Sequence, residues 1–529
     1  MKASRLFTLC LVLAFLNPFL KAQENTGNPN KNIVVLGSSV ASGWVTSYEE
    51  KYDFKNGWAY RLERYLKDRG YDVINKGIPG DNTKDAIERF DEDVLPENPD
   101  YLIVGLSMSN EGLETEDPDS VYLSFQTGIR KIIAKCESED IYPVLGLCYA
   151  NDNFTPQQYG YLKRMNIEMN TYGYPCINFL GAFDDGYGHL PGSFKFDPNH
   201  PDNRGHEEFF LSFIPDLFQA IDEGIKLPEL IDHDSYIKLG KKENNQYLYF
   251  FPSENMHSFS FSFDFRMMKN GELAQIRTDN TTRLIEINGG KLFYMEEEIS
   301  GHGSKLLKKW NRITISHQYL AQNTHIYLNE KLIASSRDQI EPAVFIIGSE
   351  SSAGQFRNLM IHRAALNGDE IVALNDQLIH ASLVCYAPLE NGNLKNHAQT
   401  KSIVYLDPEN GSYLLKRSID KIHNAALHRA NELKIEDKMP IEMDPEEYTK
   451  FAGTYEIAEN DNFVIEVEND KIYFVDRGRR GEILPEAANK FFIKFPGEID
   501  FTFEIAEDGS VKGMVANFNG QKIPAKRID

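Results

Sequence analysis

The first part of the chain alternates short apolar runs with longer stretches in which apolar residues recur every three or four positions. The apolar runs predict strands and the amphipathic stretches predict helices. The predicted strands are 32–36, 72–75, 101–106, 142–147 and 177–180. The predicted helices are 58–69, 83–93, 119–136, 155–171 and 203–221. This alternation predicts a parallel sheet covered by helices, an α/β domain that spans residues 31–225.

The pattern changes from about residue 227 onward to short runs in which apolar and polar residues alternate. Examples are 259–263, 312–315 and 325–328, which are separated by turns rich in Asn and Gly. Alternation with a period of two is typical of strands that are buried on one face. We therefore expect an antiparallel β-sandwich over residues 228–390.

The last quarter of the chain contains two further segments. Residues 391–445 are polar and partly helical in pattern, and they are predicted to be a connector. Residues 446–529 return to short apolar runs and predict a small antiparallel β domain that resembles a barrel. Its predicted strands are 463–467, 471–474, 490–494, 501–504 and 513–518.

The N-terminus has the features of a secretory signal in residues 1–22. Lys2 and Arg5 precede an apolar run over 6–20, and a plausible cleavage end follows it. Asn17 and Pro18 interrupt this run, which is shorter than the ~20 apolar residues that a membrane-spanning helix requires. We expect an exported protein, periplasmic or extracellular, without stable membrane insertion.

Composition narrows the possible partners. The chain has 529 residues and a formal charge of -23, and loss of three cations with the signal would make it -26. This charge repels nucleic acid and anionic membrane surfaces, so neither is an expected partner. Cys10 lies in the signal. An oxidising compartment would permit disulfides among the other cysteines, but we favour buried thiols: Cys136, Cys148, Cys176 and Cys385. No metal-ligand spacing is evident, and no metal or cofactor is expected.

Candidate catalytic residues follow the predicted strands of the α/β domain. Ser39 comes after the first strand, and Asp197 and His200 lie three positions apart near the end of the domain. An ester-cleaving serine needs a base to take its proton and an acid to orient that base. We predict Ser39 as nucleophile, His200 as base and Asp197 as the group that orients it.

A second set of residues could bind the oxyanion that forms during ester cleavage. The candidates are the backbone N–H groups of Ser39 and Gly80 and the side-chain amide of Asn110. All three follow predicted strands, and parallel strands end at the same edge of a sheet. Asp81 is expected to hold the loop in place rather than to react.

Several alternatives remain open at this point. Ser39 could cap a helix, and Gly80 and Asn110 could be turn residues without a catalytic role. His206 competes with His200 for the role of base. Two aromatic residues that follow the candidate nucleophile, Trp44 and Tyr48, could line a substrate cleft or could pack against the sheet.

The residues around these positions resemble the four sequence blocks of the GDSL or SGNH hydrolases. Ser39, Gly80, Asn110 and the pair Asp197 and His200 match the blocks in order. The resemblance covers residues 31–225. It implies a flavodoxin-like three-layer α/β fold, esterase or lipase activity and no metal. Two positions differ from the family pattern, because Ser38 and Glu111 stand where the family usually has Asp.

The later segments resemble other known domains. Residues 230–390 are similar to laminin-G-like or concanavalin-like jelly rolls, with motifs such as 310–314 and 324–333. That resemblance implies a two-sheet sandwich that could bind glycans or could act as a spacer. The segment from Tyr448 onward, with 451–455, is similar to the small β domain appended to secreted serine-hydrolase and β-lactamase-like proteins.

Together these observations predict a secreted bacterial serine ester hydrolase that removes short acyl groups. The resemblance and the sandwich favour acetyl groups on carbohydrate, so the expected partner is an acylated carbohydrate ester. One alternative is a lipase or lysophospholipase of the same family. Another is a catalytically inactive glycan-binding or adhesion protein.

Overall fold

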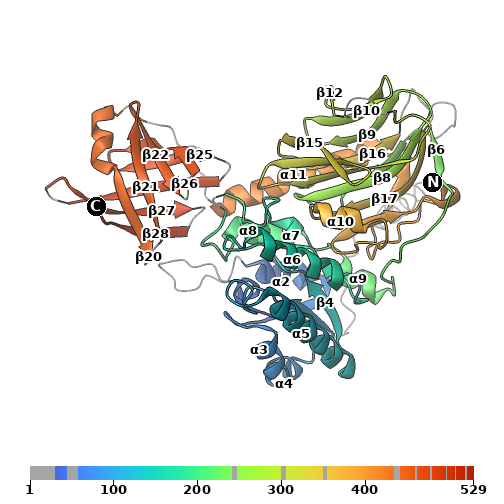
Figure 1. Cartoon of the computed structure of the whole chain (residues 1–529), viewed down its shortest axis with the longest axis horizontal. Helices are drawn as coiled ribbons and strands as arrows, with labels where there is room; N and C mark the ends of the chain where they lie inside the picture. Colours follow the sequence, from blue (N-terminus) through green and yellow to red (C-terminus); the bar gives the residue numbers. More distant parts are fainter. Residues whose placement is uncertain are drawn as a thin grey trace, which may run out of the picture.

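The computed structural model describes most of the chain from residue 30 to the C-terminus (Figure 1). The described residues are 30–43, 57–192, 194–240, 247–299, 305–348, 354–433, 441, 443–458, 461–476, 479–495, 497–506, 508–518 and 521–529. The expected signal in residues 1–22, including Cys10, lies outside them, and so do Trp44 and Tyr48. Within the described ranges, no helix combines the length and the apolar character needed to cross a bilayer.

The first domain is built on a five-stranded parallel sheet with the order β2-β1-β3-β4-β5. Its strands are β1 (Lys31–Gly37), β2 (Tyr71–Gly77), β3 (Tyr101–Gly105), β4 (Tyr142–Gly146) and β5 (Cys176–Ile177). The middle strand β1 is apolar and fully buried from Ile33 to Leu36, as expected for a strand covered on both faces. The prediction of a parallel α/β sheet is therefore confirmed.

Two groups of helices pack around this sheet. In one group α5 contacts α3 and α6, and in the other α2 contacts α8. The helices are α1 (Ser39–Ser42), α2 (Trp58–Leu66), α3 (Thr83–Glu88), α4 (Phe90–Asp93), α5 (Pro118–Ser138), α6 (Pro156–Met169), α7 (Phe179–Ala182), α8 (Asn203–Leu211) and α9 (Leu217–Asp222). Short 3-10 helices occur at Lys67–Arg69 and Leu95–Glu97.

The structure corrects three of the expected elements. The helix expected at 83–93 is interrupted at Arg89 and forms α3 and α4. The strand expected at 177–180 ends at Ile177, because the side chain of Asn178 accepts a hydrogen bond from Gly181 N at 2.8 Å and begins α7. The helix expected at 203–221 is divided into α8 and α9, with Pro215 in the break.

The middle of the chain forms two seven-stranded sheets in which every pairing is antiparallel. One sheet has the order β12-β11-β10-β9-β16-β7-β19. Its strands are β12 (Glu297–Glu298), β11 (Lys291–Tyr294), β10 (Thr282–Asn288), β9 (Gly271–Arg277), β16 (Val344–Gly348), β7 (Tyr247–Phe250) and β19 (Val404–Leu406). The strand β19 comes from the stretch 391–445 that the sequence analysis treats as a connector.

The other sheet has the order β15-β14-β13-β8-β17-β18, and β6 pairs with β17. Its strands are β15 (Lys331–Arg337), β14 (Asn323–Leu328), β13 (Asn311–Gln318), β8 (Phe259–Met267), β17 (Gly354–His362), β18 (Leu383–Ala387) and β6 (Ile237–Leu239). Phe259 and Phe261 of this sheet contact Phe345 of the other at ring distances of 5.2 and 5.1 Å. The sheets thus share a core, while the laminin-G-like or concanavalin-like assignment stays a prediction.

The C-terminal segment is a curled, nearly barrel-shaped antiparallel sheet of nine strands with its own apolar core (Figure 1). Its order is β23-β22-β21-β20-β28-β27-β26-β25-β24. The strands are β20 (Gly453–Ala458), β21 (Asp461–Glu468), β22 (Lys471–Asp476), β23 (Arg479–Glu482), β24 (Leu484–Ala487), β25 (Lys490–Phe495), β26 (Gly497–Ile505), β27 (Val511–Phe518) and β28 (Gln521–Arg527). A short α10 (Gly368–Ala373) belongs to the sandwich, and the long α11 (Gly411–Leu433) precedes the C-terminal domain.

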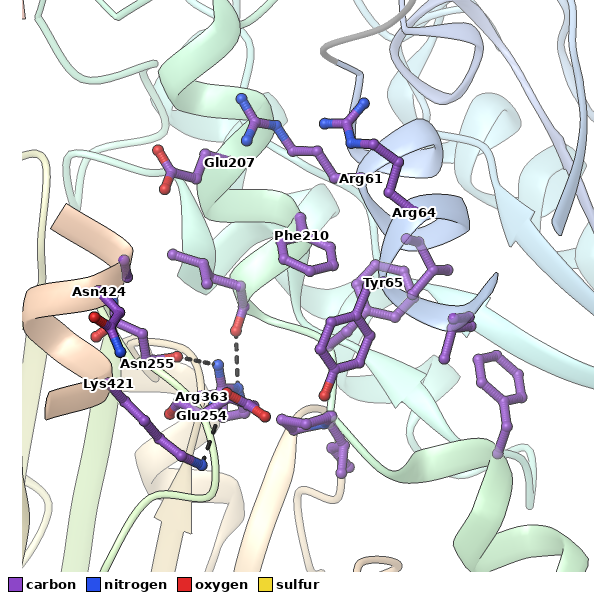
Figure 2. A pocket seen from close by; sticks show the side chains of 18 residues that line it. Arg61, Arg64, Tyr65, Glu207, Phe210, Glu254, Asn255, Arg363, Lys421 and Asn424 are labelled. Atoms are coloured by element: carbon purple, nitrogen blue, oxygen red, sulfur yellow. Dashed lines mark hydrogen bonds and ion pairs between the residues drawn. The ribbon is translucent and has the colours of Figure 1, made fainter. Parts of the chain in front are cut away.

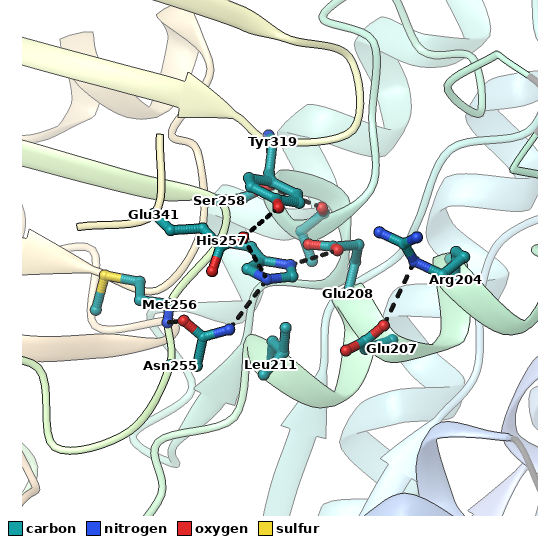
Figure 3. A network of polar contacts seen from close by, with 12 residues as sticks. Arg204, Glu207, Glu208, Leu211, Asn255, Met256, His257, Ser258, Tyr319 and Glu341 are labelled. Atoms are coloured by element: carbon teal, nitrogen blue, oxygen red, sulfur yellow. Dashed lines mark hydrogen bonds and ion pairs between the residues drawn. The ribbon is translucent and has the colours of Figure 1, made fainter. Parts of the chain in front are cut away.

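The α/β domain and the sandwich meet in a buried polar interface (Figure 3). His257, before β8, is fully buried and its Nδ1 lies 2.7 Å from Oε1 of Glu208 on α8. The other ring nitrogen lies 3.1 Å from Asn255 Nδ2, which can only donate, so His257 carries its proton on Nδ1. The His257 ring also stacks on Tyr319 of the sandwich at 3.8 Å. This network joins the two domains into one packed body, whose buried apolar residues form a single cluster.

The four cysteines of the described chain are all free and buried: Cys136, Cys148, Cys176 and Cys385. The prediction of buried thiols is therefore confirmed. Burial also raises the pKa of the Cys136 and Cys148 thiols to about 12, which keeps them protonated and unreactive at neutral pH.

Candidate active site

Ser39 lies directly after β1, at the start of the short helix α1, where the chain leaves the carboxyl edge of the sheet. The turn requires glycine at position 37, because a Cβ there would lie 2.4 Å from the carbonyl oxygen of Gly105 on β3. Gly77, at the end of β2, is equally constrained, since its Cβ would lie 2.5 Å from Ser42 N. The ends of three strands therefore approach closely around Ser39.

His200 and Asp197 come from a tight turn that faces Ser39. The Ser39 hydroxyl oxygen lies 2.8 Å from His200 Nε2. The other ring nitrogen, Nδ1, lies 2.7 and 2.9 Å from the two carboxylate oxygens of Asp197. The structure thus places the three residues expected from the sequence in one continuous chain of hydrogen bonds.

The Asp197 carboxylate is held in its ionised form. Burial alone would raise its pKa, but the hydrogen bond and charge of His200 and the backbone N–H groups of Asn199 and His200 bring the pKa below its usual value. An ionised Asp197 fixes the His200 proton on Nδ1 and leaves Nε2 free to accept a proton from Ser39. The side chain of His200 is 18% exposed, so a substrate can approach the pair.

The loop that carries Gly80 is tied to the end of β1. Gly80 has a φ of 92°, a left-handed conformation that favours glycine. Ile78 N donates to Gly37 O at 2.9 Å. Asp81 pairs with Arg89 at 2.6 Å, and Arg89 also reaches Gly37 O at 3.4 Å. Gly80 is exposed at the edge of the sheet beside the turn that carries Ser39.

Asn110 lies in the loop after β3, and one N–H of its side-chain amide donates to Asp81 O at 3.0 Å. That bond fixes the orientation of the amide beside the Gly80 loop and leaves its second N–H available. The expectation that Asp81 holds this loop agrees with its contacts, because its side chain binds Arg89 and its carbonyl binds Asn110.

The two departures from the family pattern have defined structural roles. Glu111 accepts hydrogen bonds from Thr83 N at 3.0 Å, Thr83 Oγ1 at 2.7 Å and Ser124 Oγ at 2.8 Å. It thereby joins the loop that carries Asn110 to the start of α3, just after Gly80. Ser38 is buried, caps α1 through its backbone and hydrogen-bonds to Tyr149. Neither residue replaces a member of the hydrogen-bonded chain.

His206, the competing candidate for the base, lies elsewhere. It is fully buried on α8, where its Nδ1 accepts a hydrogen bond from Trp58 N at 3.4 Å and its ring packs against Phe209. These contacts place His206 in the core next to the start of α2, whereas the ring nitrogen that contacts the Ser39 hydroxyl belongs to His200.

The sequence reasoning missed a supporting loop after β4. Asp152 N donates to Pro198 O at 2.9 Å, and Asn153 Nδ2 donates to Asn199 Oδ1 at 3.1 Å, so this loop holds the turn that carries His200. Asp152 also pairs with Lys195, which precedes the turn. The position of 151–153 just after a predicted strand was a signal that could have identified it, because functional loops gather at strand ends.

The described residues include no group of three or more His, Cys, Asp or Glu side chains that could hold a metal ion. A cavity of about 610 Å³ lies away from Ser39, between α2, α8 and α11. The candidate active site is defined by the hydrogen bonds among Ser39, His200 and Asp197 and not by the size of a cavity, because proton transfer depends on those contacts.

Comparison with known proteins identifies the family of the first domain. Residues 35–208 match the GDSL-like Lipase/Acylhydrolase family, and residues 437–527 match a domain of unknown function, DUF3471. The chain therefore contains a GDSL-like lipase/acylhydrolase domain, and the family expected from the sequence for this domain is confirmed.

Individual relatives are distant. The uncharacterized lipoprotein YqeF of Bacillus subtilis (strain 168) is 29% identical over 124 residues, which are 23% of this chain and 50% of that protein. The match thus spans half the length of this curated relative. Solved structures include the lipase/acylhydrolase from Enterococcus faecalis, at 19% identity over 38% of this chain and 100% of that chain, with a TM-score of 0.29. An acetylxylan esterase from Geobacillus stearothermophilus has 18% identity over 35% of this chain and 92% of that chain, with a TM-score of 0.27.

Proposed function

We propose that this chain is a serine ester hydrolase that removes short acyl groups, with acetylated carbohydrate as its substrate. The observation that carries the proposal is the contact of 2.8 Å between the Ser39 hydroxyl and His200 Nε2, with Asp197 at 2.7 Å on the opposite side of the ring. A serine with this partner can be activated at neutral pH, whereas an isolated serine hydroxyl cannot.

In the first half of the reaction, Ser39 Oγ attacks the carbonyl carbon of the ester while His200 Nε2 takes its proton. The carbonyl oxygen becomes negatively charged and accepts hydrogen bonds from the Ser39 and Gly80 backbone N–H groups and from the Asn110 amide. The protonated His200, stabilised by Asp197, then gives its proton to the departing alcohol. An acyl group remains bound to Ser39.

In the second half, water replaces the alcohol. His200 takes a proton from the water as it attacks the acyl carbon, and Ser39 recovers its hydroxyl proton when the carboxylic acid leaves. Asn110 contributes here through orientation, since its bond to Asp81 O sets the direction of its remaining N–H. These steps require no metal.

The acetyl group and the carbohydrate are the finer parts of the proposal. They come from the resemblance of the first domain to GDSL or SGNH hydrolases and from the attached sandwich, for which we propose glycan binding. Export follows from the expected signal in residues 1–22, and the name of the relative YqeF, a lipoprotein, supports an exported protein.

The first test is hydrolysis of an aryl acetate by the wild type and by Ser39→Ala. The expected result is a fall in kcat/KM of about a thousandfold or more, since the nucleophile is removed. Ser42→Ala is the matched control, because Ser42 lies in the same short helix and its hydroxyl donates to the backbone oxygen Ser39 O. Equal rates for wild type and Ser39→Ala would remove Ser39 from the mechanism.

Substrate class is tested by acetate release from a panel of acetylated polysaccharides and by a series of aryl esters of increasing acyl length. The proposal predicts the highest kcat/KM for acetyl esters and acetate release from at least one polysaccharide. A preference for long acyl chains would favour a lipase instead. Glycan binding without any ester hydrolysis would favour an inactive binding protein.

A further inference from the structure

The cavity of about 610 Å³ lies where the α/β domain, the sandwich and α11 meet (Figure 2). Helix α2 contributes Tyr65, α8 contributes Phe210, and α11 closes one side with Lys421. Ser39, Asp197 and His200 are not among its lining residues. Its volume is within the range of small-molecule sites, so it can hold a ligand independent of the ester substrate.

The charged residues that line the cavity are mostly cationic. Those among the described residues are Arg61, Arg64, Arg363, Lys421, Glu207 and Glu254. Among the described residues, Arg363 and Lys421 lie together with Glu254, so two cations face one acid there in a chain whose formal charge is -23. This local reversal of sign favours an anionic ligand.

Arg363 provides a buried cation at the base of the cavity. The residue is 3% exposed, and its guanidinium donates to the backbone carbonyl oxygens of Leu211, Glu254 and Asn255. These bonds use three of its five N–H groups, and two remain for a ligand. Burial lowers the pKa of Arg363 to about 10, because carbonyl oxygens hold the guanidinium without neutralising its charge.

Glu254 neutralises only part of this charge. Its carboxylate lies 3.8 Å from Lys421 and 4.0 Å from Arg69, so a single acid is shared between cations. Burial lowers the pKa of Lys421. Glu254 opposes this shift, and the nearby charges of Arg417 and Arg363 lower the pKa further. A second negative charge placed between Lys421 and Arg363 would therefore be stabilised.

The remaining wall is apolar. Leu62, Tyr65, Phe210, Phe213 and Ile214 line it on the side of α2 and α8. The Tyr65 and Phe210 rings contact each other edge to face at 5.7 Å. The cavity thus has an apolar wall next to a floor that carries positive charge. This combination fits a molecule with one anionic end and an extended hydrocarbon body, because each part is then buried against a matching surface.

We propose that this cavity is a binding site for a medium-chain monocarboxylate, with the carboxylate between Arg363 and Lys421 and the hydrocarbon chain along Tyr65 and Phe210. The site is separate from the hydrogen-bonded chain at Ser39 and does not depend on the proposed esterase activity.

The test is isothermal titration calorimetry of the full chain with decanoate below its micellar concentration. Decanol has the same chain without the charge, and acetate has the charge without the chain; both are expected to bind more weakly. Lys421→Glu should weaken decanoate binding about tenfold or more, since it replaces a charge-assisted contact with repulsion. Ala425→Trp, which adds bulk to the α11 wall without changing charge, should also weaken it.

Lys416→Glu is the matched control, since it makes the same charge change on the same helix at a side chain that is 72% exposed and pairs with Asp420. It should bind decanoate as the wild type does, and thermal unfolding should show that all three variants are folded. The proposal is overturned if decanoate gives no saturable binding. It is also overturned if Lys421→Glu and Lys416→Glu bind equally, or if decanol binds as tightly as decanoate.

Discussion

The sandwich and the C-terminal domain are both antiparallel β structures, but they relate to the α/β domain in different ways. The buried apolar residues of the sandwich belong to the same cluster as those of the α/β domain. The C-terminal domain has a separate cluster around Phe451, Tyr455 and Phe503. A shared core means that the sandwich and the α/β domain stabilise each other, whereas a separate core allows the C-terminal domain to fold alone.

The contacts at the first interface are specific as well as apolar. Ala365 N donates to Gly181 O at 2.8 Å, and a Cβ at Gly181 would lie 2.3 Å from Ala365 O. Asn178 donates from its side chain to the buried Glu370 at 2.9 Å. These contacts come from α7 and its cap, and α8 contributes the contact of Glu208 with His257. Because α7 and α8 flank the turn with His200, the sandwich supports the candidate active site as part of its framework.

Truncation should give the largest effect. A chain that ends at Pro440 lacks the C-terminal domain and should remain folded, with an unchanged kcat/KM on aryl acetate. A chain that ends at residue 225 loses the sandwich and exposes the shared core, so it should be insoluble or unfolded by circular dichroism. A folded and active 225-residue fragment would show that the two domains are independent.

Breaking the buried pair at the interface should have the next largest effect. Glu208→Ala leaves the His257 Nδ1–H without an acceptor in a site that excludes water. We expect the free energy of unfolding to fall by about 1–3 kcal/mol, the cost of a buried neutral donor that has lost its acceptor, measured by urea denaturation. The comparison variant is Lys471→Ala, which breaks an exposed ion pair with Glu482 in the C-terminal domain. It should leave the urea unfolding transition of the α/β domain and the sandwich unchanged. A similar loss of unfolding free energy in both variants would contradict the difference between the two β domains.

Buried carboxyl groups at the same interface should also make the stability of the protein depend on pH, with a smaller effect than Glu208→Ala. Burial raises the pKa of Asp184 and of Glu370 to about 7. In the unfolded chain such carboxyl groups titrate near pH ~4. The folded state therefore binds more protons between these values, and stability should fall as pH rises from about 4 to about 7.

Asp184→Asn replaces one of the two titrating carboxyl groups with an amide that does not titrate. The amide can still accept a hydrogen bond from Gly188 N and donate one to the Tyr159 hydroxyl. The fall in Tm between about pH 4 and about pH 7 should become shallower. Asp234→Asn, the same substitution at a fully exposed side chain, should keep the wild-type slope. An unchanged slope in Asp184→Asn would show that this carboxyl titrates normally.

Much of the first domain could be predicted from local sequence pattern. Strand–helix alternation located the parallel sheet, and the positions of Ser39, Gly80 and Asn110 after strands placed them at one edge. The contact between Asp197 and His200 was also predictable, because the two residues lie three positions apart in a turn. Local pattern failed at 177–180, where a side-chain cap from Asn178 began a helix inside an apolar run.

The interface could not be predicted, because its partners are distant in sequence and lack a local pattern. Glu208 and His257 are ordinary residues of a helix and a loop until folding brings them together. The same holds for Arg363, whose carbonyl partners come from α8 and from residues 254–255. The roles of Glu111 and Asp152 in supporting the site also depend on such long-range contacts.

The most direct test of the central claim is covalent labelling with a fluorophosphonate followed by peptide mass spectrometry. The contact of Ser39 with His200 and Asp197 predicts a single modified residue, Ser39, and loss of labelling in His200→Ala. A wild-type protein that hydrolyses esters but carries the label elsewhere, or no label at all, would contradict the account.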